Sequence, residues 1–391
     1  MKQAQTMSLP TVITESAALA AFCARLESEA FITVDTEFMR EKTYFPQLCL
    51  VQIAGSNEAA AIDPLASDLD LTPLYTLLAN EHVLKVFHAC RQDIEIFYHH
   101  AGKVPSPIYD TQIAAMVCGY GESAGYESLV NKILHRSVDK SSRFTDWSKR
   151  PLTEKQLTYA MDDVLHLREI YAALQKRLTE TGRAHWINEE MQPLLDPKTY
   201  DMDPNDAWRK IRLRQNSPRY LAMAQAAARW RELTARERNV PRGRVMKDET
   251  LAEVAHTKPE DFVGLQAIRG FYPTMSATHY ESLFAMLKEA ETLPSSEWPR
   301  IPAKPAMPEG SEAIVDLLRL LLKACAAKHH VVPRLIADKD DLELLAIGTR
   351  ENIHALTGWR YEIFGEHALR LLSGNVAIKA DGKNGITFID L

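Results

Sequence analysis

Two carboxylates lie two residues apart in Val34-Asp-Thr-Glu37, within a segment that is otherwise suited to a buried strand. Because side chains alternate along a strand, Asp35 and Glu37 project from the same face. Neighbouring carboxylates in a core repel each other and lose hydration, and a hard divalent cation such as Mg²⁺ or Mn²⁺ would reverse that cost. On this pair alone, a strand end at which both acids reach solvent is the more ordinary interpretation.

A further acid follows in Phe87-His-Ala-Cys-Arg-Gln-Asp93, where a predicted strand runs into a polar turn and then a helix. Asp93 would lie in the first turn of that helix, near the carboxyl end of the strand, where open α/β sheets commonly bind ligands. The helix dipole also favours an acid at this position without any further function. Asp93 therefore indicates a site only in combination with other acids.

The segment Tyr159-Ala-Met-Asp-Asp163 belongs to a predicted long helix. Tyr159 and Asp163 are four residues apart and share a helix face. Asp162 is rotated by about 100° from Asp163 and is expected to face elsewhere, and it could replace Asp163 only if the tyrosine spacing were three. A core tyrosine beside an acidic surface is the ordinary alternative.

The elements that would position these residues alternate over the first 180 residues. Hydrophobic patterning predicts strands at 31–37, 48–54, 58–63 and 83–88, and helices at 16–26, 72–78, 91–100, 111–118, 126–134 and 153–180. This alternation predicts an α/β domain with a mixed sheet. Ser16 is expected to cap the first helix, and Asp110 to cap the helix that follows it.

In combination, the acids and the tyrosine resemble the tyrosine-bearing branch of the DEDD exonuclease superfamily. The sequence around and between these residues resembles the ribonuclease D family over roughly residues 10–185. The matching segments occur in that family's order: Asp35-Thr-Glu-Phe38, Thr43-Tyr-Phe-Pro46, Leu48-Cys-Leu-Val-Gln52, His88-Ala-Cys-Arg-Gln-Asp93, Asp110-Thr-Gln-Ile113, Asp139-Lys-Ser141, Thr145-Asp-Trp147 and Arg150-Pro-Leu152, before Tyr159.

The resemblance implies an α/β RNase-H-like 3′→5′ exonuclease domain at residues 1–195, which removes nucleoside 5′-monophosphates from the 3′ end of RNA. It implies two divalent cations, Mg²⁺ or Mn²⁺, held by Asp35, Glu37, Asp93 and Asp163, with Asp35 bridging both. Tyr159 would orient the attacking water. A general-base role is less expected, since an unperturbed tyrosine titrates near pH 10.

Four neighbours of the acids are weaker candidates for contact with the terminal nucleotide, and each could equally be a packing residue: Phe38, Met39, His88 and Gln92. The implied substrate is structured RNA with a single-stranded 3′ tail, with transfer RNA precursors as the expected case. A DNA 3′→5′ exonuclease remains an alternative, because the acidic motifs do not report on a 2′-hydroxyl. An inactive RNA-binding protein is the other alternative.

The net charge of −6 and the pI of about 6.1 conceal a basic segment. Residues 208–247 hold twelve Lys or Arg against two acids, a local charge of +10. Trp208, Tyr220 and Trp230 are interleaved with arginines, which is typical of nucleic-acid surfaces, although a core role is favoured for each aromatic. The candidate nucleic-acid contacts are Arg209, Arg212, Arg214, Arg229, Arg231, Arg242 and Arg244.

The same region resembles a helicase-and-ribonuclease-D C-terminal (HRDC) domain, through Arg231-Glu-Leu233, Asn239-Val-Pro-Arg-Gly243 and Asp248-Glu-Thr-Leu251. We expect a helical domain at 205–292, a proline-rich linker at 293–310 and a second helical, HRDC-like domain at 311–391. Both accessory domains are expected to be all-α helical bundles, with Ser311 capping the first helix of the second domain. Residues 375–391 are expected to be a strand or a loose tail.

The cysteines are odd in number, widely spaced and without a C-x-x-C pair, which argues against disulfides and structural zinc and for a reducing cytosol. Met1–Pro10 lacks the pattern of a signal peptide. Ile314–Ala327 is too short and too charged to span a bilayer. We therefore expect a cytoplasmic location, no membrane association and no obligate protein partner.

Overall fold

A mixed β-sheet forms the centre of the N-terminal part of the chain in this computed structural model, which describes residues 11–302, 305–382 and 385–391. The strand order is β1-β4-β3-β2-β5-β6. The strands are β1 (Val12–Ile13), β2 (Phe31–Met39), β3 (Gln47–Ala54), β4 (Ala59–Ile62), β5 (Leu84–Phe87) and β6 (Ile108–Asp110). Strands β2, β3 and β4 pair antiparallel, whereas β5 joins β2 and β6 in parallel, so the predicted mixed sheet is confirmed.

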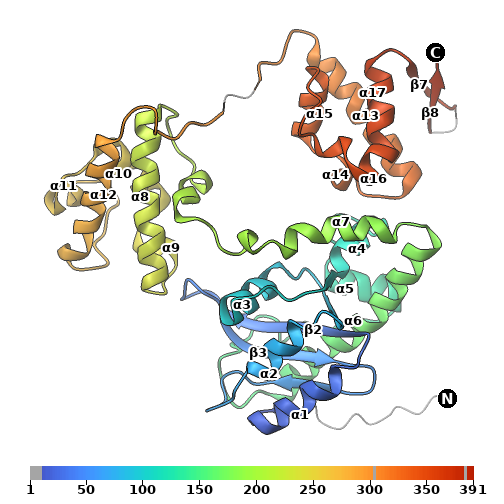
Figure 1. The fold of residues 1–391 in the computed structure, drawn as a ribbon, viewed down its shortest axis with the longest axis horizontal. Coiled ribbons are helices and arrows are strands. Elements are labelled where there is room, and N and C mark those ends of the chain that lie inside the picture. Colours follow the sequence, from blue (N-terminus) through green and yellow to red (C-terminus); the bar gives the residue numbers. More distant parts are fainter. Residues whose placement is uncertain (1–10, 303–304, 383–384) are drawn as a thin grey trace.

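Helices cover both faces of this sheet (Figure 1). They are α1 (Ser16–Leu26), α2 (Thr72–Leu78), α3 (Arg91–Ala101), α4 (Thr111–Val117), α5 (Tyr126–Leu129), η1 (Val130–Leu134), α6 (Glu154–Glu180) and α7 (Ala184–Leu195). Apolar residues of α1, α2 and α3 share a core with one face, and α6 packs on the other face with Trp147. The long helix α6 is thus held directly over the strand that carries the first two acids.

The predicted bounds of α1 and α2 are confirmed. The short strands β1 and β6 were not predicted from the hydrophobic patterning. The expected cap of α1 was wrong. Glu15 is the cap residue, and Ser16 begins the helix. The Ser16 hydroxyl instead donates to the carbonyl of Asp68 and accepts from the backbone N–H of Asp70, so it ties α1 to a distant loop.

The first helical region, residues 204–292, has a core of its own. Its elements are η3 (Pro204–Lys210), α8 (Pro218–Glu237), α9 (Arg242–Val245), α10 (Asp248–Thr257), α11 (Phe262–Gln266), η4 (Ala277–Tyr280) and α12 (Glu281–Thr292). Trp208, Tyr220 and Trp230 are buried in that core, which confirms the packing role favoured for these aromatics.

A cluster that we call the latch joins this region to the loop between β2 and β3. The Tyr44 hydroxyl donates to the buried Glu232 carboxylate, which also pairs with Arg236 and Arg242. Both guanidinium groups lie over the Tyr44 ring. The Asn239 side-chain oxygen accepts from the backbone N–H groups of Tyr44 and Phe45, at 3.1 and 3.0 Å. The latch residues therefore belong to two parts of the chain that are nearly 190 residues apart.

The second helical region, residues 311–391, lies against α7 (Figure 1). It contains α13 (Ser311–His329), α14 (Pro333–Ile336), α15 (Lys339–Ala346), η5 (His354–Leu356), α16 (Gly358–Arg360), η6 (Tyr361–Gly365), α17 (Glu366–Leu372), β7 (Val376–Ala380) and β8 (Ile386–Asp390). The expectation of an all-α domain needs correction here, because β7 and β8 pair as an antiparallel hairpin. Ser311 is the first residue of α13, and Gly310 is its cap residue.

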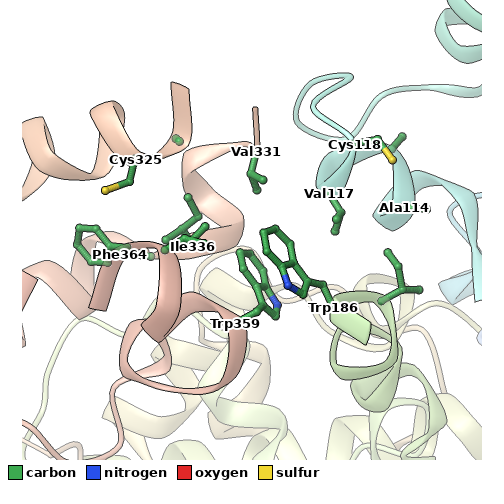
Figure 2. Packing of buried hydrophobic residues seen from close by; sticks show 14 of the residues in the cluster. Ala114, Val117, Cys118, Trp186, Cys325, Val331, Ile336, Trp359 and Phe364 are labelled. Atoms are coloured by element: carbon green, nitrogen blue, oxygen red, sulfur yellow. The ribbon is translucent and has the colours of Figure 1, made fainter. Parts of the chain in front are cut away.

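Two tryptophans mark the contact between the second helical region and α7. The rings of Trp186 and Trp359 stack with centroids 4.2 Å apart and an angle of 11° between their planes (Figure 2). Arg360 is buried beside them and pairs with Glu190. Phe364 is also buried, whereas Tyr361 is 40% exposed. The contact forms one hydrophobic core with α4, α6 and α7.

The described residues of the predicted linker, 293–302 and 305–310, contain no helix or strand. The expectation for Met1–Pro10 lies outside the described residues. None of the helices in the described part of the chain has the length and apolar character that crossing a bilayer requires. All five cysteines are buried and unpaired.

Candidate active site

Strand β2 lies inside the sheet and carries the first two acids. It pairs with β3 on one side and β5 on the other, so Asp35 is opposite Gln52 and Glu37 is opposite Leu50. A β-bulge follows directly after Glu37, where the pairing with β3 shifts. Bulges bend a strand and redirect its side chains, and they are frequent beside active sites. The two carboxylates therefore project from one face of a strand that ends its regular pairing at the second acid.

Two hydrogen bonds hold α6 against this strand and its neighbour β3. The Thr33 hydroxyl donates to the carbonyl of Val164 at 2.8 Å, and the Arg168 guanidinium donates to the carbonyl of Ala54 at 2.9 Å. Val164 directly follows Asp163, so the bond from Thr33 fixes the position of α6 next to Asp163. As a result, carboxylate oxygens of Asp35, Glu37 and Asp163 all lie within 4.8 Å of one another. Asp163, not Asp162, belongs to this group.

Asp93 enters the site from the first turn of α3, where it is buried. It accepts a hydrogen bond from the Thr36 hydroxyl, on the strand residue between the first two acids. It is not part of the group of three, but it is close enough to Asp35 for each charge to disfavour the other. Asp93 thus lies beside the group, on its β5–α3 side.

The junction between β5 and α3 is fixed by Asp110. Its carboxylate accepts from the backbone N–H groups of Ala89 and Cys90, both at 2.9 Å, and from that of Gln112 at 2.7 Å. The last bond confirms the predicted cap of α4. The other two hold a turn in which Ala89 has a φ of 55°. The capping acid therefore also positions the turn that presents Asp93.

These acids line a cleft of about 940 Å³, which we call the acidic cleft. Its volume is at the upper end of the range for small-molecule sites. The weaker candidates Phe38, Met39, His88 and Gln92 all line it. His88 bonds Thr111 through Nδ1, while its Nε2 is buried and has no partner among the described residues.

Burial dominates the electrostatics of the acidic cleft. It raises the pKa of Asp35 to about 7 and, together with the charge of Asp35, raises the pKa of Glu37 to about 10. The pKa of Asp93 and that of Asp163 are likewise raised by burial and then by Asp35. Groups that disfavour one another's charge in this way are stable as carboxylates only beside a strong positive charge.

The donor set fits a hard divalent cation. Every donor is a carboxylate oxygen, and Mg²⁺ and Mn²⁺ prefer such ligands. Oδ1 of Asp163 is buried without a hydrogen-bond partner among the described residues, an arrangement that is costly unless an ion or water is bound there. Asp35, Glu37 and Asp163 would hold such an ion, with Asp93 beside them.

Tyr159 lies one helical turn before Asp163 and lines the same cleft. Its ring packs against Trp147, with centroids 6.2 Å apart. Burial, followed by the charge of Asp163, raises the pKa of the Tyr159 hydroxyl well above its ordinary value. The hydroxyl therefore stays protonated at neutral pH and can orient a water molecule, which supports the predicted role over that of a general base.

Two residues at the cleft were not singled out from the sequence. Arg143 and Phe144 line it from the segment before α6. Phe144 is 91% exposed although the flanking Trp147 is buried, and the Arg143 guanidinium lies over its ring at 5.2 Å. The charge of Arg143 lowers the pKa of Glu37 and that of Asp163. In the sequence, the available signal was their position directly before the matching segment Thr145-Asp-Trp147.

The stability of the metal-free protein is expected to depend on pH through Asp35. Its pKa rises from 3.8 to about 7 on folding, so the native state binds more protons between these values. Stability contributed by this group then falls as pH rises through that window. We expect the difference in Tm between wild-type and Asp35→Asn protein in EDTA to fall from about pH 4 to pH 7, and saturating Mg²⁺ to abolish the fall. A difference that is flat in EDTA contradicts this origin.

Two of the arginines predicted to contact nucleic acid are structural. The Arg231 side chain is only 6% exposed and pairs with Asp248 at 2.6 Å, while also donating to the carbonyl of Met246. It is not available to a ligand, because α8 buries this face in the core. Arg242 is half-buried in the latch, where it pairs with Glu232. The residue type and the charge excess could not distinguish these roles.

The other predicted arginines are more accessible. Arg209 and Arg214 form exposed ion pairs with carboxylates of their own region. Arg229 is half-buried, and Arg212 and Arg244 are exposed. Exposed pairs are weak, so a phosphate could compete for these arginines. Their contact with nucleic acid remains a prediction.

Comparison with known proteins agrees with this geometry. A family model described as a 3′–5′ exonuclease matches residues 10–179, and one for the HRDC domain matches residues 221–287. The chain is 48% identical to ribonuclease D of Jannaschia sp., over 96% of this chain and 98% of that protein. It is 46% identical to ribonuclease D of Granulibacter bethesdensis, over 96% and 95%. The chain belongs to the ribonuclease D family.

A solved structure extends the similarity to the whole architecture. Escherichia coli RNase D, described as an exoribonuclease involved in structured RNA processing, aligns with a TM-score of 0.79 at 31% identity. The alignment covers 94% of this chain and 99% of that one, so it includes both helical regions. The catalytic core of RRP6 from Trypanosoma brucei shares the fold at 21% identity, with a TM-score of 0.55. The protein is accordingly a nuclease that carries a 3′–5′ exonuclease domain.

Proposed function

We propose that this protein is a 3′→5′ exoribonuclease that trims structured RNA with a single-stranded 3′ tail, with transfer RNA precursors as the expected substrate. The observation that carries the proposal is the gathering of Asp35, Glu37 and Asp163 within 4.8 Å, beside Asp93 and Tyr159 in one open cleft. The identity to ribonuclease D proteins over nearly the full length supports RNA as the substrate class. The unpaired, buried cysteines support a cytoplasmic location.

In this proposal Asp35, Glu37, Asp93 and Asp163 would hold two divalent cations, Mg²⁺ or Mn²⁺. Such cations would supply a lowered pKa for the attacking water and stabilisation of the departing 3′ oxygen. The Tyr159 hydroxyl donates to and orients the water. The terminal nucleotide contacts the cleft residues Phe38, Met39, His88 and Gln92, and Phe144 offers an exposed ring on which a base can stack. The product is a nucleoside 5′-monophosphate.

We also propose a domain organisation in which each part of the chain has its own role. Residues 1–195 form the exonuclease domain, and residues 205–292 form an HRDC domain that binds the body of the RNA. Residues 293–310 link it to a second HRDC-like domain at 311–391. The latch between Tyr44 and Glu232 supports a fixed placement of the first helical region beside the acidic cleft.

Tyr159→Phe is expected to lower kcat about a hundredfold, because the water loses the hydroxyl that orients it while the ring still packs on Trp147. KM is expected to change little. Tyr171→Phe is the matched control, since Tyr171 lies on the same helix but does not line the cleft. Steady-state kinetics on a tailed RNA measure both values, and a kcat for Tyr159→Phe equal to that of the control contradicts the assigned role.

Parallel assays on RNA and DNA hairpins of the same sequence, each with a single-stranded 3′ tail, test the substrate class. We expect release of mononucleotides from the RNA tail and a much lower kcat/KM on the DNA tail. Equal rates would favour the DNA exonuclease alternative. Binding of RNA without release of mononucleotides under any divalent ion would favour the inactive RNA-binding alternative.

A further inference from the structure

A second hollow, of about 330 Å³, lies on the first helical region. We call it the basic hollow. Arg238, Arg244 and Lys247 contribute to its lining, which contains no Asp or Glu. The three cations are exposed, and none forms an ion pair with a residue that the structure describes. In contrast, other arginines of the same segment are paired with carboxylates: Arg209, Arg214, Arg219, Arg231, Arg236 and Arg242. Six of the twelve cations in residues 208–247 form no ion pair with a described residue, and three of those six line this hollow.

The basic hollow also presents a solvent-exposed aromatic ring, that of Tyr272. Tyr272 lines the basic hollow and is 77% exposed, whereas the preceding Phe271 is buried against Tyr280. The Tyr280 hydroxyl accepts from the backbone N–H of Thr274, and the Thr250 hydroxyl donates to the carbonyl of Gly270. The backbone on both sides of Tyr272 is thus anchored while its ring faces solvent. A fixed, exposed ring beside cations matches the stacking platforms and phosphate contacts of single-stranded nucleic-acid sites.

The latch connects the basic hollow to the acidic cleft. Lys42 and Thr43 line the cleft, and the next residues of that loop are bonded to Asn239. Arg238 and Val240, on either side of Asn239, line the hollow. The linings of the two depressions therefore meet across a contact that hydrogen bonds and a buried ion-pair cluster hold in place. An RNA strand that leaves the cleft over this contact passes directly from the exonuclease domain onto the first helical region.

We propose that the basic hollow is a second RNA subsite, which binds single-stranded nucleotides upstream of the 3′ end held in the acidic cleft. This inference rests on the proposed exonuclease function. Arg238, Arg244 and Lys247 contact phosphates, and a base stacks on Tyr272. Because the lining contains no carboxylate, the hollow is better suited to bind a polyanion than a protein surface that carries charges of both signs. The latch holds the two subsites at a fixed position relative to each other. A sufficiently long single-stranded tail therefore occupies both.

The test uses the full-length chain and two RNA substrates. One is a trinucleotide that fits the cleft alone, and the other is a hairpin with a single-stranded tail of about ten nucleotides. The variants are Tyr272→Ala and the double variant Arg244→Gln/Lys247→Gln. Tyr272→Phe keeps the ring, and Lys210→Gln/Lys288→Gln removes two exposed charges of the same region that do not line the hollow.

We expect Tyr272→Ala to raise KM about tenfold on the tailed hairpin and to leave kcat/KM on the trinucleotide unchanged. Tyr272→Phe and Lys210→Gln/Lys288→Gln should behave as wild type on both substrates. For the double variant, the slope of log affinity against log salt should become shallower by roughly 1.4, as expected for two lost phosphate contacts on a single strand. Affinity is measured in an Asp35→Asn background, so the RNA stays intact.

An unchanged KM on the tailed hairpin, or an equal loss on both substrates, would overturn the proposal. So would an unchanged affinity and salt slope for the double variant, which would leave the hollow to a protein partner. Failure of the proposed function looks different, because the wild-type protein would then release no mononucleotides from either RNA. The binding arm distinguishes the two failures, since it requires no catalysis.

Discussion

Asp35→Asn is expected to abolish RNA trimming while leaving RNA binding largely intact. Asp35 is the acid whose charge shifts the pKa of Glu37, of Asp93 and of Asp163, so it lies at the centre of the acidic cleft. An asparagine keeps the size of the side chain but supplies no negative charge for divalent cations. Loss of cation binding removes several kcal/mol of transition-state stabilisation, or roughly a thousandfold or more in rate.

The acids of α6 supply a matched pair for the same experiment. Asp163→Asn is expected to behave like Asp35→Asn, whereas Asp162→Asn should retain activity, because only Asp163 belongs to the carboxylate group. Release of mononucleotides measures activity, and retention of labelled RNA measures binding. Near-normal trimming by Asp35→Asn in saturating Mg²⁺, or equal effects of the two α6 variants, would contradict the assigned site.

Glu232→Ala is expected to destabilise the protein by about 3–5 kcal/mol, the usual cost of removing one partner of a buried ion pair. The Glu232 side chain is only 1% exposed, and its removal leaves Arg236, Arg242 and the Tyr44 hydroxyl without their shared acceptor. Burial acts to raise the pKa of Glu232, but hydrogen bonds from Arg242 and Tyr44 outweigh it and leave the pKa below its ordinary value. The carboxylate is therefore charged at neutral pH.

Denaturant unfolding of Glu232→Ala measures this loss, with Glu237→Ala as the control. Glu237 lies on the same helix and is exposed, so its removal should change stability by less than about 0.5 kcal/mol. Because the folded pKa of Glu232 is lowered, its contribution is present above the ordinary value of 4.5 and is lost as pH falls through the folded pKa. A destabilisation that is small at neutral pH, or that persists unchanged in acid, contradicts the electrostatic account of the latch.

The residues of the acidic cleft were predicted by regular periods together with the resemblance to DEDD exonucleases, since each motif taken alone favoured an ordinary structural role. The strand period put Asp35 and Glu37 on one face, and the helix period selected Asp163 over Asp162. The same local patterns predicted the mixed sheet and the bounds of α2 (Thr72–Leu78). The contact of α6 with β2 and β3 could not be predicted in this way, because it depends on hydrogen bonds of Thr33 and Arg168 to residues more than one hundred positions away.

Roles that depend on partners far along the chain were not predictable. Arg231 and Arg242 could not be separated from exposed arginines, because their carboxylate partners and their burial arise only on folding. Tyr44 lies in a segment that matches the ribonuclease D family, but no feature of the neighbouring sequence indicated its contact with Glu232. The short strands β1 and β6 are too brief to show a period. Long-range pairing and burial, rather than residue type, decide each of these roles.

The most direct test of the central claim follows a hairpin RNA with a short single-stranded 3′ tail, labelled at its 5′ end, in Mg²⁺, Mn²⁺ or EDTA. If Asp35, Glu37, Asp93 and Asp163 hold catalytic divalent cations, the tail shortens one nucleotide at a time from its 3′ end and nucleoside 5′-monophosphates accumulate in either metal. In EDTA, and for Asp35→Asn in any metal, the RNA remains at full length. Shortening that proceeds in EDTA, or that begins at internal positions, would contradict the account.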